Sequence, residues 1–330
     1  MKNIVYFLLI MLSTIIILPL IIVRGCSVKN DTNYIEFPKT NELKVYIVSE
    51  KKTVSMDLEE YTKSVVAAEM PAEFDSEALK AQAVAARTYA YARMNGLYTS
   101  RESIHPDAHV CTDFSHCQGW ISMEEAKKNW GKASAEKYWN KIEKAVKDTE
   151  NIVIYYGDTI IDPLFHSCSG GKTADASEVW PGQNIPYLVS VDSPGEEINP
   201  NYTTSISITA KDFIDKIKTV YSDFKADEND VLKDVKILDY TASGRVGTFS
   251  LAGYTMTATQ FRDLFLLKSA FIKLEQDSSK NVIITTTGSG HGVGMSQWGA
   301  NYRAKNGSNY EEILKYYYKG VTLKEINRGN

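Results

Sequence analysis

The first apolar stretch of the chain, Ile4–Val23, contains no charged residue and is flanked by basic residues. A helix of this length spans the ~30 Å hydrocarbon layer of a bilayer. The pattern predicts an uncleaved single-pass membrane anchor over residues 1–26, with a cytoplasmic N-terminus and the rest of the chain on the outer face. A cleavable signal peptide is one alternative, although its apolar core is usually shorter, about 7–15 residues. A lipidated cysteine after Gly25 is another.

Beyond the anchor, residues 27–41 are polar and aperiodic like a tether, and residues 42–330 have the patterning of a folded body. Helical spacing predicts helices over Met56–Glu69, Ser76–Met94, Ser122–Asp148, Thr209–Tyr221, Thr257–Leu267, Met295–Asn306 and Asn309–Tyr318. Alternation of apolar and polar residues predicts strands at Glu42–Glu50, Ile152–Phe165, Tyr187–Asp192, Val235–Asp239, Thr248–Leu251 and Val282–Thr287. Because strands and helices mix without regular alternation, we expect an α+β fold: one transmembrane helix followed by a single large mixed α/β body.

The amino-acid composition excludes some classes of function. The 330 residues are 24% charged and 43% apolar, as in globular proteins. A chain of this length can bury a full core without metal or disulfide support. The formal net charge of −4 gives no overall attraction to phosphates, so no nucleic-acid partner is expected. The 20 tyrosines and 5 tryptophans suit contacts with sugar faces as well as core packing.

A carboxylate at the end of a predicted helix is the strongest catalytic candidate. Glu69 lies two residues before Pro71, and a proline disfavours helical backbone in the residue before it, so the helix should end near Glu69. The negative end of the helix dipole and the apolar neighbours are both expected to raise the pKa of Glu69. A carboxyl that stays protonated near neutral pH can act as a general acid. An exposed glutamate without a role is the alternative.

The next predicted helix carries a mixed stripe of basic and aromatic residues. Lys80, Val84, Arg87 and Tyr91 are spaced by four, three and four and therefore share one face. A cationic and aromatic stripe beside a carboxyl suits an anionic sugar polymer, so Lys80, Arg87 and Tyr91 are predicted to bind substrate. A solvated helix face is the alternative.

A loop segment gathers histidines and cysteines. His105, Cys111, His116 and Cys117 are the right types and number for a closed tetrahedral zinc site, although their spacing matches no standard finger. Three of the five histidines of the chain lie in this segment, which favours zinc over a Cys111–Cys117 disulfide, the alternative outside the cytoplasm. Four protein ligands leave no position for water, so the zinc is predicted to be structural.

Two turns that contain glycine are predicted to bind a ligand. In Gly288–Gly299, His291 stands between glycines, where the backbone can approach a ligand closely. In the other turn, His166, Ser167 and Ser169 precede two glycines. Neither segment completes a dinucleotide fingerprint, a nucleophile elbow or a phosphate loop, because each lacks a required glycine or acid.

Three ordered motifs carry a resemblance to a known family. They are Glu69-Met70-Pro71 with Glu77–Tyr89, then Ser169-Gly170-Gly171 with Val179-Trp180, then Gly290–Ala300. From about Leu43 to Tyr318 the chain resembles the stage II sporulation protein D family. One departure is Thr287-Gly288-Ser289, where many members carry an aromatic residue before Gly-His-Gly.

The resemblance implies a membrane-anchored peptidoglycan lytic transglycosylase that cuts peptide-stripped (denuded) glycan strands during engulfment of the forespore. It places the catalytic glutamate at Glu69, the groove-lining helix at Lys80, Arg87 and Tyr91, and a further substrate contact at Gln297. Members with a Cys/His zinc loop support zinc in this chain. The implied partners are glycan strands, an amidase or endopeptidase, and membrane proteins of the engulfment machinery, in the space between mother cell and forespore.

A single strong carboxyl candidate implies that Glu69 acts twice, whereas ordinary glycosidases use two carboxyl groups. Protonated Glu69 would donate to the oxygen between N-acetylmuramic acid and N-acetylglucosamine. As a carboxylate it would then deprotonate the muramic 6-hydroxyl, which closes on C1 to give a 1,6-anhydro end. A hydrolytic product would instead make Glu73, Asp75 or Glu77 the second acid. A non-catalytic glycan binder is the other alternative, because related domains occur in amidase enhancers.

Overall fold

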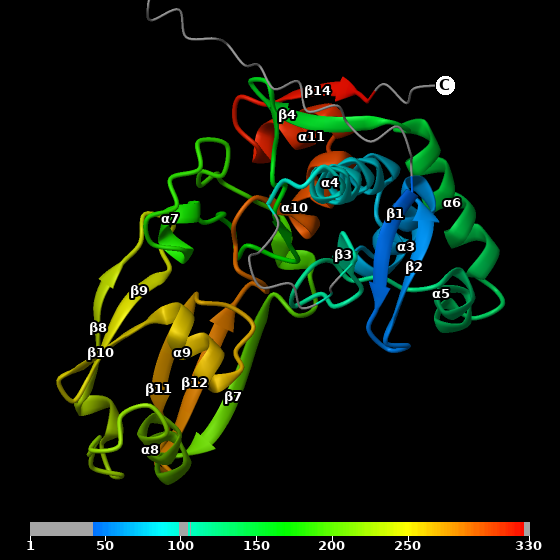
Figure 1. The fold of residues 1–330 in the computed structure, drawn as a ribbon. Helices are drawn as coiled ribbons and strands as arrows, with labels where there is room; N and C mark the ends of the chain where they lie inside the picture. The colour runs from blue at the N-terminus through cyan, green and yellow to red at the C-terminus, as the bar shows by residue number, and fades with distance from the viewer. Residues whose placement is uncertain (1–41, 99–104, 106, 327–330) are drawn as a thin grey trace, which may run out of the picture. The chain divides into compact units, whose positions relative to one another are not determined.

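The computed structural model describes residues 42–98, 105 and 107–326 (Figure 1). These described residues belong to one compact unit. The predicted anchor, residues 1–26, and the predicted tether, residues 27–41, lie outside the described residues. Among the helices that the structure does describe, none combines the length and apolar character needed to cross a bilayer. The body is a mixture of helices and strands, as the α+β prediction states.

Most helices begin where a short polar side chain caps them, although α6 and the two 3-10 turns have no such cap. Their bounds are α3 (Leu58–Glu69), α4 (Ser76–Met94), α5 (Met123–Trp130), α6 (Ala135–Asp148), α7 (Ala176–Val179), α8 (Ala210–Lys218), α9 (Ala258–Phe265), α10 (Gln297–Lys305), α11 (Tyr310–Tyr317), and the 3-10 turns η2 (Glu196–Ile198) and η3 (Val231–Lys233). Asp57 accepts hydrogen bonds from the first backbone N–H groups of α3, and Asp75 does the same for α4. The predicted bounds of α4 are confirmed at both ends, and the predicted end of α3 at Glu69 is confirmed.

The strands form small sheets. Their bounds are β1 (Glu42–Ile47), β2 (Lys52–Asp57), β3 (Val110–Cys111), β4 (Ile152–Tyr156), β5 (Thr159–Ile160), β6 (Phe165–His166), β7 (Thr203–Thr209), β8 (Val235–Tyr240), β9 (Val246–Leu251), β10 (Tyr254–Thr257), β11 (Ile272–Gln276), β12 (Asn281–Thr287), β13 (Met295–Ser296) and β14 (Thr322–Glu325). The sheet orders are β2-β1-β3, β14-β4-β5, β10-β9-β8, β11-β12-β7 and β13-β6. Most pairs are antiparallel, but β3 runs parallel to β1 and β13 parallel to β6.

Three predicted elements differ in the structure. The segment Ile152–Phe165, predicted as strand, contains the separate strands β4 and β5 and the start of β6. The helix expected over Ser122–Asp148 is broken into α5 and α6 at Gly131, whose φ of 73° lies in the left-handed region that glycine adopts without strain. The strand expected at Tyr187–Asp192 does not form; this segment contributes only an isolated bridge between Asp192 and Lys172.

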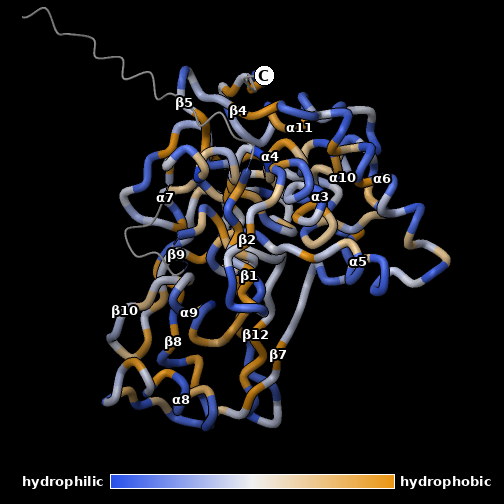
Figure 2. The backbone as a smooth tube through the Cα atoms, turned by 45° about the vertical axis from the view of Figure 1, so that its right-hand side comes forward, coloured by the Kyte–Doolittle hydropathy of each residue, from blue (hydrophilic) through white to orange (hydrophobic). Residues whose placement is uncertain are grey.

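Helix α4 is the centre of the largest apolar region. It packs against α3, α6, α10, α11 and β4, and Figure 1 shows these elements around it. Its many alanines let neighbouring backbones approach closely, which explains why nearly every side chain of α4 is buried. Figure 2 shows hydrophobic residues gathered around α4 and along β12. Most side chains of α4 therefore face other elements of the fold, and Tyr89 is the exception that reaches the pocket described below.

Residues 203–287, called here the insert, have an apolar core of their own. Phe213, Phe249 and Phe261 are fully buried in it, between α8, α9 and the strands β7 to β12. Hydrogen bonds tie the insert to the preceding segments: Arg245 Nη2 donates to the carbonyl of Ser169 at 2.6 Å, and Ser243 donates to Glu178. The insert is therefore a separately packed part of the same compact unit.

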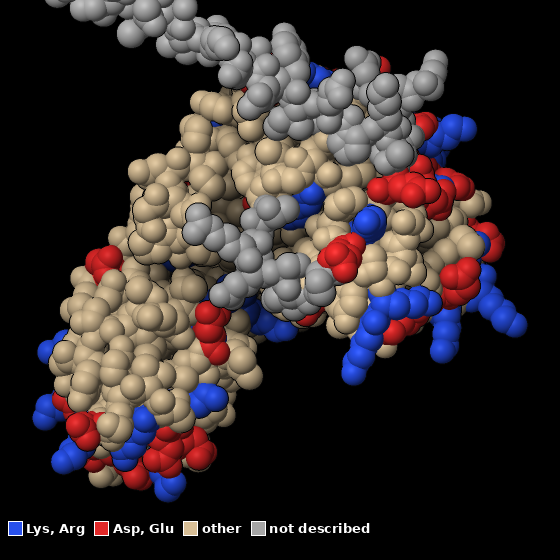
Figure 3. Space-filling model, viewed as in Figure 1, with Lys and Arg blue, Asp and Glu red and all other residues tan. Residues whose placement is uncertain are grey.

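On the face seen in Figure 3, Lys, Arg, Asp and Glu side chains of both signs are interspersed around α8 and over α5 and α6. Ion pairs on these helices include Lys211 with Asp215 on α8, and Lys127 of α5 with Glu136 of α6. Exposed pairs of this kind contribute little to stability. This face presents no single-sign patch.

Candidate active site

A pocket of about 900 Å³ contains Glu69. Its lining residues come from six segments: Glu69 at the end of α3, Tyr89 of α4, and residues within 114–118, 163–167, 262–268 and 289–291. The segment 262–268 belongs to the insert. The pocket therefore brings together the predicted acid, part of the histidine–cysteine loop and both predicted glycine turns.

Glu69 is held where α3 ends. Met70 has extended backbone (φ −125°, ψ 134°), as expected before Pro71, and this turns the chain out of the helix. The backbone N–H of Gly119 donates to Glu69 Oε1 at 2.6 Å, and the side chain of Gln297 forms a second hydrogen bond with the carboxyl. Burial raises the pKa of Glu69, and the two hydrogen bonds lower it by less. The predicted direction is confirmed, with burial as its main cause.

Gly119 was not predicted from the sequence. A Cβ at this position would lie 2.9 Å from Glu69 Oε1, so a side chain would push the carboxyl away. In the sequence Gly119 follows Cys117 by two residues, but nothing local indicates that the loop returns to Glu69.

The histidine–cysteine loop converges on one point. One donor atom from each of His105, Cys111, His116 and Cys117 lies within 4.8 Å of the other three. Cys117 Sγ is 3.3 Å from His116 Nδ1 and 3.6 Å from His105 Nε2, and Cys111 Sγ is 3.5 Å from His116 Nδ1. With Zn–S of about 2.3 Å and Zn–N of about 2.0–2.1 Å, the sulfur–nitrogen edge of a tetrahedral site is about 3.6 Å.

The loop geometry explains how these four side chains meet. Cys111 lies in β3, which pairs with β1, and the carbonyl of Asp113 accepts from the N–H groups of His116 and Cys117 in a tight turn. Cys111 and Cys117 are free thiols in the structure. The residues present fit a structural zinc in number, type and spacing.

His166 and His291 lie side by side in the pocket, with ring centroids 5.6 Å apart. Burial lowers the pKa of His291 to about 4 and lowers the pKa of His166 well below its usual value, so both rings are neutral at pH 7. His166 Nδ1 is 3.0 Å from the carbonyl of Val293, which makes this nitrogen the donor. Its Nε2 is then an acceptor, and it has no partner among the described residues.

The close approach of the two turns requires glycine. Gly290 has φ 107°, and a Cβ there would lie 2.7 Å from the Cβ of His166. Ser167 lines the pocket, as predicted, but Ser169 does not. Ser169 Oγ instead donates to the buried carboxylate of Glu196 at 2.8 Å. Gln297 is buried and contacts Glu69, so it can position the acid.

The stripe of α4 does not reach this pocket, which corrects the prediction for Lys80, Arg87 and Tyr91. None of the three lines it. Arg87 is fully buried and donates from Nε and Nη2 to the carboxylate of Glu59. Lys80 pairs with acids of α4 and α6, and Tyr91 is buried in the apolar cluster around β1. The side chains of this stripe contact other elements of the fold and not a ligand pocket.

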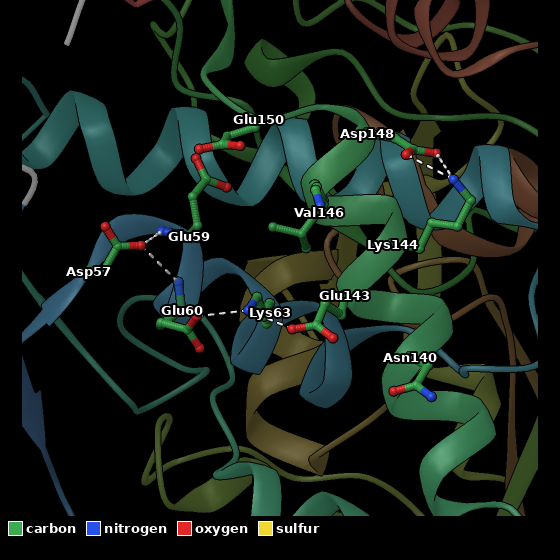
Figure 4. Close-up of a pocket in the computed structure, with 11 residues that line it drawn as sticks. Asp57, Glu59, Glu60, Lys63, Asn140, Glu143, Lys144, Val146, Asp148 and Glu150 are labelled. Carbon is green, nitrogen blue, oxygen red and sulfur yellow. Dashed lines mark hydrogen bonds and ion pairs between the residues drawn. The ribbon is translucent and has the colours of Figure 1, made fainter.

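A second hollow, of about 800 Å³, lies between α3 and α6 (Figure 4). Acidic residues dominate its lining, yet most of its charges are matched locally. Lys63 lies between Glu60 and Glu143, at 2.7 and 3.1 Å, and Lys144 pairs with Asp148 at 2.9 Å. It contains none of the predicted site residues. The Glu69 pocket is therefore the candidate active site.

Comparison with known proteins identifies the family of this chain. A family model described as Stage II sporulation protein matches residues 46–156, which include Glu69 and the histidine–cysteine loop. The chain is 36% identical over 284 residues to "Stage II sporulation protein D" of Bacillus subtilis (strain 168), covering 86% of this chain and 79% of that protein. It is 32% identical over 334 residues to the protein of the same name from Bacillus amyloliquefaciens, covering 97% and 93%.

A further relative carries a different name. "Amidase enhancer" of Bacillus subtilis (strain 168) is 29% identical over 309 residues, covering 79% of this chain and 40% of that protein. The identity and coverage of the two sporulation proteins, together with the three ordered motifs, decide the assignment. The chain belongs to the stage II sporulation protein D family.

Proposed function

We propose that this protein is a lytic transglycosylase that cleaves the bond between N-acetylmuramic acid and N-acetylglucosamine in denuded glycan strands during forespore engulfment. The observation that supports this is the environment of Glu69: a carboxyl with a raised pKa, in a pocket large enough for sugar units. A protonated carboxyl at neutral pH is what the departing glycosidic oxygen needs.

The acid acts twice in this proposal. Glu69 first gives its proton to the glycosidic oxygen, and the C1–O bond breaks. The resulting carboxylate is stabilised by the N–H of Gly119 and by Gln297, which already bond to it. It then takes the proton of the muramic 6-hydroxyl while the oxygen bonds to C1, which returns Glu69 to its protonated form and leaves a 1,6-anhydro end.

The carboxylates suggested for a hydrolytic second step have other roles. Asp75 caps α4, Glu77 pairs with Lys80, and Glu73 hydrogen-bonds Tyr138. None of them lines the pocket. Asp263 of α9 is the remaining carboxylate among the described lining residues, and it is exposed. A single-acid mechanism therefore fits better than a two-acid one.

We also propose that His105, Cys111, His116 and Cys117 hold a structural zinc. When bound, the metal would fix the loop as a tetrahedral centre without an open position. The loop ends two residues before Gly119, so its shape sets the position of the N–H that contacts Glu69. The chemistry itself needs only the chain's own groups.

The proposed setting is the cell membrane. Ile4–Val23 would anchor the chain as a single span with the body outside, in the space between mother cell and forespore. Denuded strands carry no peptides, so an amidase must act before this protein. Because one relative is named "Amidase enhancer", we propose a cell-wall amidase as the partner of this protein.

The same name supports a second candidate, a non-catalytic glycan binder that stimulates an amidase. An assay distinguishes the transglycosylase from the binder: the full-length protein is incubated with denuded glycan, and the products are analysed by mass spectrometry. Anhydro ends from the wild type, lost in Glu69→Gln and kept in Asp263→Asn, support the transglycosylase. An absence of cleavage, with amidase stimulation retained in Glu69→Gln, would support the binder.

A further inference from the structure

The chain turns sharply after α9, and this turn faces the Glu69 pocket. Residues 262–268, called here the α9 corner, lie outside the residues 46–156 matched by the family model. Leu266 ends the helix with a left-handed backbone conformation (φ 53°), which residues other than glycine rarely adopt. Local strain of this kind is often kept for function. Leu266 is nevertheless 85% exposed, so the fold gains no buried surface from it.

The α9 corner is held firmly in place. Leu267 N–H donates to the carbonyl of Arg262 at 2.9 Å, and Arg262 Nε donates back to the carbonyl of Leu267 at 3.3 Å. Gly290 N–H donates to the carbonyl of Lys268 at 2.9 Å, which joins the corner to the glycine turn that carries His291. Its side chains are thus presented to the pocket by a fixed backbone.

Two cations of the α9 corner lack an acidic partner. Within the described residues, no carboxylate lies within the 4.0 Å ion-pair distance of Arg262 or Lys268, although both line the pocket. Arg87 and Arg93, which lie away from the corner, are each paired with an acid. The one acid of the corner is the exposed Asp263. The positive charge of Arg262 also contributes to the lowered pKa of His291, which is consistent with its closeness to the pocket.

The pocket rim is also apolar on two sides. Leu266, at 85%, and Phe114, at 82%, have the highest exposed fractions among the large hydrophobic side chains of the described residues. Both line this pocket, from segments far apart in the chain. An exposed ring beside polar groups suits the C–H face of a sugar.

We propose that Arg262 and Lys268 bind the lactyl carboxylates of N-acetylmuramic acid, while Leu266 and Phe114 pack against the sugar rings. In a peptide-bearing strand this carboxyl is consumed in an amide bond, whereas a denuded strand carries one free carboxylate per disaccharide. Charge-assisted hydrogen bonds to that carboxylate would therefore select denuded strands. This inference rests on the proposed function, because it assigns the substrate preference of the same site.

The test measures binding apart from cleavage. Full-length Glu69→Gln protein in detergent is titrated calorimetrically with denuded glycan oligosaccharides and with the same oligosaccharides whose carboxyls have been amidated. We expect the carboxylate form to bind more tightly, and R262Q/K268Q to weaken its binding by about tenfold while leaving the amidated form nearly unchanged. Lys273→Gln is the matched control, because Lys273 lies on β11 of the same insert, is exposed and pairs with Glu275.

Each outcome decides between the claims. Equal affinity of R262Q/K268Q and the parent protein for the carboxylate form would overturn this inference. Failure of the wild type to form anhydro ends, with the carboxylate preference intact, would overturn the proposed reaction and leave the binding site standing. Because Arg262 also bonds to Leu267, the single variant Lys268→Gln is measured as well. It alters only an exposed side chain, and we expect about threefold weaker binding of the carboxylate form.

Discussion

Arg87 and Glu59 form a buried, two-point ion pair: Nε lies 2.9 Å from Oε1, and Nη2 lies 2.6 Å from Oε2. The remaining donors of Arg87 reach the carbonyls of Ile152 and Val146 at 3.2 Å. This arginine therefore links α4 to α3, to the end of α6 and to β4. Its position on one helix face with Lys80 and Tyr91 suggested a ligand contact, but the partners of its guanidinium group are residues of the protein itself.

Replacing Arg87 by alanine should destabilise the fold. The change removes the arginine partner of the buried Glu59 carboxylate, and breaking such a pair costs about 3–5 kcal/mol. Urea denaturation of the full-length protein checks this. Unchanged stability together with weaker glycan binding would return Arg87 to the role predicted from its spacing.

Replacing Gly119 by alanine should lower activity more than stability. The new methyl group would contact Glu69 Oε1 and shift the carboxyl, so we expect kcat on denuded glycan to fall by about 10²-fold. The KM and the urea midpoint should change little. A variant with normal kcat would show that the position of the Gly119 N–H does not matter for the reaction.

The pH dependence follows from the direction of the pKa shift of Glu69. The folded protein holds this proton more tightly than the unfolded chain, so stability falls as pH rises from the unfolded pKa through the raised folded pKa. Glu69→Gln removes this loss and should raise the free energy of unfolding at pH 7 relative to wild type. Wild-type cleavage should decline as pH rises through the same folded pKa. A stability difference that is independent of pH would contradict the assignment.

Metal analysis should find about one zinc per chain. Chelation should lower the melting temperature, because a ligand that binds only the folded state stabilises it. Cys111→Ser should show both effects without chelator, whereas Cys168→Ser, outside the loop, should keep the zinc. Absence of zinc with Cys111 and Cys117 oxidised would establish the disulfide instead.

Replacing Phe114 by alanine should weaken glycan binding without affecting the fold. Its ring is mostly exposed, so stability should change by less than about 0.5 kcal/mol, while the affinity of the Glu69→Gln background for glycan should fall by about 1 kcal/mol. Leu238→Ala, an exposed apolar side chain of β8 outside the pocket, is the control. Equal affinities of the two variants for glycan would show that the ring of Phe114 does not contribute to glycan binding.

Local signals predicted the parts of the site that depend on local structure. Pro71 ends α3 at Glu69, and Asp75 begins α4, so both helices could be bounded from the sequence. The glycine turn around His291 was predicted for the same reason, because left-handed backbone needs glycine.

Contacts between distant segments could not be predicted in this way. Helical spacing shows which residues share a face but not what covers that face, so the stripe of α4 was assigned to a ligand although α6 and β4 enclose it. Gly119 and Arg262 had no local signal either. Gly119 contacts Glu69 from 50 residues away in the sequence, and Arg262 reaches the same pocket from the insert.

The insert contributes one wall of the pocket, whereas the proton donor and its supporting loop lie within residues 46–156. In the proposed function, the residues that select the polymer and the residue that breaks the bond lie in separate stretches of the chain. Under that proposal, we expect exchange of residues 203–287 to change which polysaccharide the pocket accepts while Glu69 keeps its hydrogen bond from Gly119.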